Sequence, residues 1–183
     1  MVDEQYKDKI NKLITVFKEA EKQLKHSEHD TNKLSIPSIN QLRYVAFHLV
    51  ESFALKDTTK VEEELNKAIN HAQRAKYDAV EIGIVYYLEQ IKIFQETYST
   101  YTETLDILPN YIEYLTKAQN ASDELQKIKD EEKDREEYYK DIAPYYQALK
   151  DIYLSLQTAI PLITKKIQKN TRLKKYNKTK EKK

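Results

Sequence analysis

The side chains best placed to do chemistry follow one another at steps of three, four and three residues: His71, Arg74, Asp78 and Glu81. Residues three or four apart share one side of a helix, so these four groups would be neighbours. Such a stripe can form a polar functional site. It can equally form a structural network, because partly buried charges need partners. The sequence leaves both interpretations open.

A second group lies in the string Arg43-Tyr44-Val45-Ala46-Phe47-His48, with Glu51 shortly after it. This Arg-x4-His string on a predicted helix resembles the signature of the HEPN superfamily, small all-α domains that include metal-independent ribonucleases of toxin and phage-defence systems. The resemblance implies that Arg and His meet across a dimer and cleave RNA with the ribose 2′-hydroxyl as nucleophile. Arg43 would then stabilise the negative charge of the phosphate, and His48 would act as the general acid and base. Glu51, His71 and Arg74 would be candidates for supporting residues of the same site.

The same residues also have a structural interpretation. Residues five apart lie about 140° apart around a helix, so Arg43 and His48 do not share a face. Each could instead pair with carboxylates of a polar network that includes Glu51, Asp78 and Glu81.

Composition predicts long helices around these groups. The 183 residues include one Gly and four Pro, and 33% are charged, which argues against a β-sandwich. We expect an all-α fold, an antiparallel helical bundle with a long, coiled-coil-like helical hairpin.

The helix predicted to organise the bundle runs from Lys60 through Phe94 and onward to about Leu105, before Pro109. Thr59 and Glu62 have capping-box spacing at its start. Seven residues form one face: Leu65, Ala68, Ala72, Ala75, Ala79, Ile82 and Tyr86. The stretch from Val80 to Phe94 is apolar on nearly every side, which is typical of a buried helix.

Two amphipathic helices precede it. The first is expected over Asp3–Lys25, followed by a polar connector to Pro37. The second is expected over Ile39–Leu55, with Ser38 and Gln41 as its capping box. Its predicted packing face is Leu42, Val45, Ala46, Leu49 and Phe53. The short turn that follows predicts that the second helix and the organising helix are antiparallel neighbours.

Heptad spacing marks the region from Asn110 to Lys169 and is broken only at Glu132 and Arg135. Pro144 and Pro161 should kink or restart the helix, which predicts helices over Asn110–Ala143 and Pro144–Lys169, or one bent rod. The seam would pack antiparallel along the organising helix or against a second copy of the chain. We expect one domain over residues 1–164, with a coiled-coil portion projecting at about 98–140.

Residues 165–183 form a basic, partly disordered tail. They hold ten basic residues and one Glu, a net charge of +9, whereas the whole chain carries +1 and the rest therefore −8. Such a tail suits contact with phosphates or another anionic partner. The cations expected to make this contact are Lys165, Lys166, Lys169, Arg172, Lys174 and Lys175.

Several function classes are disfavoured. The chain has no Cys, no glycine-rich phosphate loop and no His-Glu-x-x-His motif, and its four histidines are scattered. We therefore expect no metal and no cofactor, and without an apolar stretch of membrane-spanning length the default location is cytoplasmic.

The favoured hypothesis is a non-enzymatic helical interaction module, oligomeric, that binds a protein partner or itself through the heptad seam, or an anionic polymer through the tail. The alternative is a HEPN-like ribonuclease or the inactive partner of one.

Overall fold

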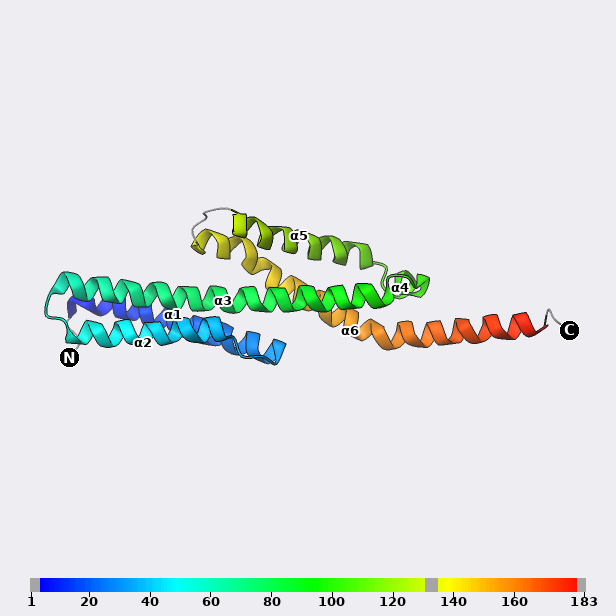
Figure 1. The fold of residues 1–183 in the computed structure, drawn as a ribbon, viewed down its shortest axis with the longest axis horizontal. Helices are drawn as coiled ribbons and strands as arrows, with labels where there is room; N and C mark the ends of the chain where they lie inside the picture. The colour runs from blue at the N-terminus through cyan, green and yellow to red at the C-terminus, as the bar shows by residue number, and fades with distance from the viewer. Residues whose placement is uncertain (1–3, 131–134, 181–183) are drawn as a thin grey trace. The chain divides into compact units, whose positions relative to one another are not determined.

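The computed structural model describes residues 4–130 and 135–180, and each element in these ranges is a helix (Figure 1). This confirms the all-α helical bundle. A short 3-10 helix, Glu4–Tyr6, precedes the six α-helices. Their bounds are α1 Lys7–Thr31, α2 Ile36–Ala54, α3 Thr58–Tyr98, α4 Thr102–Ile107, α5 Tyr111–Asp130 and α6 Arg135–Lys180.

The chain forms two compact units. The first combines residues up to Val85 with the start of α6, up to Ala143, and the second combines Tyr86–Asp130 with the chain from Pro144 onward. The helices α3 and α6 contribute to both units. The single domain expected over residues 1–164 stays a prediction.

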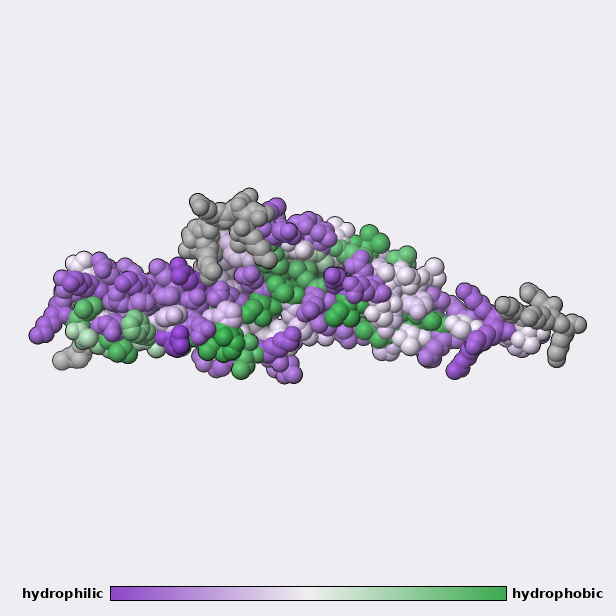
Figure 2. Space-filling model, viewed as in Figure 1, coloured by the Kyte–Doolittle hydropathy of each residue, from purple (hydrophilic) through white to green (hydrophobic). Residues whose placement is uncertain are grey.

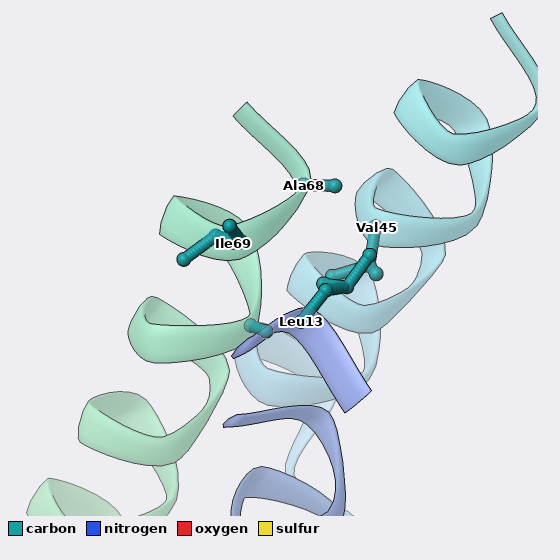
Figure 3. Close-up of a cluster of buried hydrophobic side chains, with 5 residues drawn as sticks. Leu13, Val45, Ala68 and Ile69 are labelled. Carbon is teal, nitrogen blue, oxygen red and sulfur yellow. The ribbon is translucent and has the colours of Figure 1, made fainter. Parts of the chain in front are cut away.

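In the first unit, α1 and α2 pack against the first half of α3. The predicted alanine face of α3 is confirmed for Leu65, Ala68, Ala72, Ala75 and Ala79, each 0–2% exposed. Side chains from all three helices meet in one apolar cluster (Figure 3): Leu13, Val45, Ala68, Ile69 and Ala72. Because alanine adds so little bulk, the neighbouring helices can approach α3 closely.

The helix α1 extends further than predicted, through Thr31. The buried hydroxyl of Ser27 donates a hydrogen bond of 2.6 Å to the carbonyl of Ala79 in α3. One turn later the Thr31 hydroxyl bonds the Ser27 carbonyl at 2.8 Å, and Asn32 ends the helix in the left-handed region with φ of 53°. The expected polar connector is therefore wrong in its first part, because Ser27 and Thr31 continue the buried side of α1.

Neither predicted capping box forms. The start of α3 is capped by Asp57, whose Oδ1 accepts hydrogen bonds from the amides of Thr59 at 2.9 Å and Lys60 at 3.3 Å. The helix α2 begins at Ile36 rather than Ile39, so Ser38 lies inside its first turn. The Ser38 hydroxyl pairs with that of Ser35 at 2.6 Å, and both side chains are buried.

The apolar stretch of α3 after Val80 is buried on most of its circumference but not on all of it. Val80, Ile84, Tyr87, Ile91 and Phe94 are at most 4% exposed, whereas Val85 and Ile93 are each 50% exposed. The prediction that this stretch is covered on every side is thus wrong along one stripe.

In the second unit, α3 stops at Tyr98 instead of continuing toward Leu105. The Thr104 hydroxyl donates to the Tyr98 carbonyl at 2.7 Å, which satisfies a carbonyl that has no partner within α3. Thr104 belongs to the separate short helix α4, which two side-chain hydrogen bonds join to α6: Lys166 to Asp106 at 2.7 Å and Asn170 to Glu103 at 2.8 Å.

The expected boundary at Pro144 is wrong, because α6 passes through both Pro144 and Pro161. Six of the heptad residues are buried within one chain, and the other apolar ones described are half-buried. The six are Ala118, Ala121, Ile142, Leu149, Leu156 and Ile163. In the second unit Tyr87 of α3 contacts Tyr146 and Tyr153 of α6, and α3 and α6 run in the same direction (Figure 1). The helix α5 runs opposite to α3, so the predicted antiparallel direction of the seam is right for α5 and wrong for α6. Position 132 of the predicted heptad break lies outside the described residues, as does the side chain of Arg135.

Enlarging one alanine of α3 tests the small-residue packing. Ala72→Leu should lower the free energy of unfolding by about 1–3 kcal/mol, because the added atoms have no space between α3 and its neighbours. Asn70→Leu is the matched control, since Asn70 is exposed on the same turn. Urea denaturation of both variants measures the effect, and equal stabilities would contradict close packing at Ala72.

Candidate interaction surface

The helix α2 packs on the bundle along one side. Its buried positions recur every seven residues and are Ser38, Val45 and Ser52, with 0–5% exposure. Leu42 and Leu49 pack beside Val45 against the cluster shared with α1 and α3. The Ser52 hydroxyl bonds the Leu49 carbonyl at 2.7 Å, so the buried serines have partners.

The opposite side of α2 carries its larger apolar side chains in the open. Exposure is 71% for Phe53, 65% for Val50, 55% for Phe47 and Ile36, and 37% for Ile39. We call these five residues, together with the exposed Arg43, the outer face of α2. Figure 2 shows hydrophobic surface over both ends of this helix.

The predicted packing face of α2 is therefore only partly right. Val45, Leu42 and Leu49 pack inward, but Ala46 and Phe53 are exposed. The sequence of α2 is apolar on more than one side, so its periodicity could not decide which side is buried. Contact with α1 and α3 decides it, because Val45, with Leu42 and Leu49 beside it, packs against Leu13, Ala68, Ile69 and Ala72.

Beside the buried side of α2, two histidines stack across the contact with α3. The rings of His48 and His71 lie 5.1 Å apart with an interplanar angle of 12°. Nδ1 of His48 donates to a carboxylate oxygen of Glu64 at 2.6 Å, and Nδ1 of His71 donates to the amide oxygen of Gln41 at 2.7 Å. With Nδ1 as the donor, the neutral form of each ring keeps Nε2 as an acceptor.

The stack continues outward to Arg43. Tyr44 lies 5.1 Å from the His71 ring, and the Arg43 guanidinium lies over Tyr44 at 5.2 Å from the ring centroid. Arg43 and His48 thus belong to one stack, but the rings of Tyr44 and His71 separate them.

Electrostatics of this contact favour uncharged His71 and ionised Glu64. Burial lowers the pKa of His71 from its ordinary 6.5, and the charges of His48 and Arg74 lower it further. The pKa of Glu64 is lowered by its hydrogen bond with Lys67 and then by that with His48. The Lys67 ammonium lies 2.6 Å from the carboxylate.

The structure brings together only some of the predicted site residues. Arg43, His48 and His71 share the stack, and Arg74 is close enough to affect His71. Glu51 is exposed on α2, while Asp78 and Glu81 follow along α3 and are half-buried. The prediction of these residues as one polar network stays a prediction beyond the stack.

Sequence reasoning missed Gln41, Tyr44 and Glu64 as partners in this contact. For Glu64 a signal was present, because the predicted stripe on α3 extends backward at the same spacing: Glu64, Lys67, His71 and Arg74. Gln41 was assigned to a cap that does not form, and nothing in the sequence indicates that Tyr44 stacks on His71.

The basic residues after position 164 are helical up to Lys180, where the sequence predicted partial disorder. Lys166 pairs with Asp106 of α4, whereas Lys165, Lys169, Arg172, Lys174 and Lys175 are exposed. Four side chains at helical spacing lie on one side of the helix: Lys165, Lys169, Arg172 and Tyr176. The Lys180 ammonium lies 5.1 Å from the centroid of the Tyr176 ring. Binding of an anionic partner here stays a prediction.

Among residues 4–130 and 135–180, no group of three or more His, Asp or Glu side chains is arranged to hold a metal ion. None of the helices described combines the length and apolar character that crossing a membrane requires. Comparison of the chain with protein-family models, curated proteins and solved structures gave no match.

The lowered pKa of His71 predicts an acid-sensitive contact between α2 and α3. Because the unfolded chain binds the proton more readily, the free energy of unfolding should fall as the pH drops from about 6.5 through the folded pKa. An NMR titration should place the pKa of His71 below 6.5, and His71→Gln should reduce the loss of stability between about pH 7.5 and 5.5. A pKa of 6.5 or above would contradict the buried stack.

Proposed function

We propose that this chain is a non-enzymatic helical interaction module that binds a protein partner on the outer face of α2. The observation that carries the proposal is the second apolar side of α2: Val45, Leu42 and Leu49 pack inward, whereas two phenylalanines, two isoleucines and a valine are exposed. Contiguous exposed apolar surface of this kind marks a site of protein association. The helix-in-groove and helix-on-helix modes both use such a face.

The same observation moves the proposed interface away from the heptad seam. The apolar seam residues described from Ala118 to Ile163 are buried or half-buried within one chain, so they offer less surface to another chain than the outer face of α2 does. The outer face of α2 has no such cover. An interaction module built this way would use α3 as the rigid support and α2 as the presented helix.

A photo-crosslinking residue in place of Phe47 tests this proposal in the cells that naturally make the protein. The expected result is a covalent adduct between the chain and a protein, because the side chain at position 47 would be buried in the interface. The matched control replaces Tyr101, which is an exposed aromatic of the second unit at 42%. Irradiation that gives no adduct at position 47, or equal adducts at both positions, would contradict the proposal.

A second candidate, a metal-independent ribonuclease of the HEPN kind, is favoured by the stack of Arg43, Tyr44, His71 and His48. It gathers one guanidinium and two imidazoles on a single contact, and such groups can neutralise phosphate charge and transfer protons. The weakness of this candidate is the separation of Arg43 from His48 by two rings.

Labelled RNA distinguishes the second candidate. If the stack is catalytic, wild-type protein cleaves RNA without metal, and Arg43→Ala and His48→Ala each reduce the rate by about a hundredfold or more. Lys22→Ala, an exposed position of α1, is the control. An interaction module without catalysis leaves the RNA intact with all four proteins.

A further inference from the structure

We propose that the partner of the outer face of α2 is the same face of a second copy, packed antiparallel about a two-fold axis at Phe47. This inference rests on the proposed function and names its partner. It comes from the position of the charges on the face, not from its apolar character alone.

The two ionisable residues on and beside the outer face carry opposite charges at equal distances from Phe47. Arg43 precedes Phe47 by four residues and Glu51 follows it by four, and both are exposed. Both lie within about 80° of the centre of the exposed side at 100° per residue. The face therefore has no net charge, which gives it no electrostatic attraction to an anionic membrane surface.

A two-fold axis requires a surface that is complementary to itself. When two α2 helices pack antiparallel with Phe47 opposite Phe47, residues at equal distances before and after this position face each other. Arg43 of one copy then meets Glu51 of the other, and the pair occurs twice. A parallel pairing would instead place Arg43 against Arg43, which is repulsive.

The apolar residues fit the same pairing. Val50 lies opposite Tyr44, and Ile39 lies opposite Leu55, which directly follows the end of α2. Each of these large side chains is at least partly exposed in the single chain, so each has surface to lose on association. The two α2 helices overlap over residues 40–54, a contact about 21 Å long.

A charge-swap experiment on the full chain tests the pairing, with sedimentation velocity as the measurement. Wild-type protein should dimerise below about 100 µM. Arg43→Glu and Glu51→Arg should each weaken dimerisation by about tenfold or more, because each creates two like-charge contacts. The double variant Arg43→Glu/Glu51→Arg should restore the dissociation constant to within about threefold of the wild-type value.

Lys22→Glu is the matched control, since it changes the net charge as Arg43→Glu does on an exposed site of α1. It should leave dimerisation unchanged. Circular dichroism and urea denaturation at concentrations where all proteins are monomeric should show the same fold for every variant, because the substituted side chains are exposed.

The outcomes separate this inference from the proposed function. A monomeric wild-type chain whose position 47 crosslinks to another protein overturns the second copy as partner but keeps the interaction module. A dimer that the double variant does not restore overturns the antiparallel pairing. Capture of the monomer by vesicles containing anionic lipid overturns the second copy, and a monomer with no adduct at position 47 overturns both.

Discussion

Close packing on the alanine face of α3 is the constraint on which the first unit depends. Ala68, Ala72, Ala75 and Ala79 are fully buried, so the helices beside them can lie close. Leu13 of α1 and Val45 of α2, with Leu42 and Leu49 beside it, fill the contact at Ala68 and Ala72. Phe47, Val50 and Phe53 of α2 lie on the other side, in solvent.

This arrangement links packing to function. In the single chain α2 is held on α1 and α3 by Val45, Leu42 and Leu49, while Phe47 and Phe53 are exposed. Its larger apolar surface remains available for association, and burying it would contribute about 25 cal/mol for each Å² removed from water. The histidine stack with Gln41 and Glu64 fixes α2 to α3 through directed hydrogen bonds, so α2 is held in one orientation.

The sequence predicted the helical class, the alanine face of α3 and the buried heptad residues, because each depends on a strong repeat of side-chain size or polarity. The prediction of the buried side failed for α2, because two sides of this helix are similarly apolar. Ala46 and Phe53 were assigned to the packing face of α2. Which side is buried depends on the contact with α3, and the periodicity of α2 alone does not contain that information. Helix ends were misplaced for a similar reason, since Ser27, Asp57 and Thr104 act through partners that spacing alone does not identify. For the candidate site, the α3 stripe was found but its α2 partners Gln41 and Tyr44 were not.

Hydroxyl-radical footprinting over a range of protein concentrations measures whether a second copy covers the outer face of α2. If it does, oxidation of Phe47 and Phe53 falls as the concentration rises, while that of Tyr101 and Tyr176, which are also exposed, stays constant. If Phe47 and Phe53 are instead oxidised at the same rate at every concentration, the outer face stays in solvent and no second copy covers it.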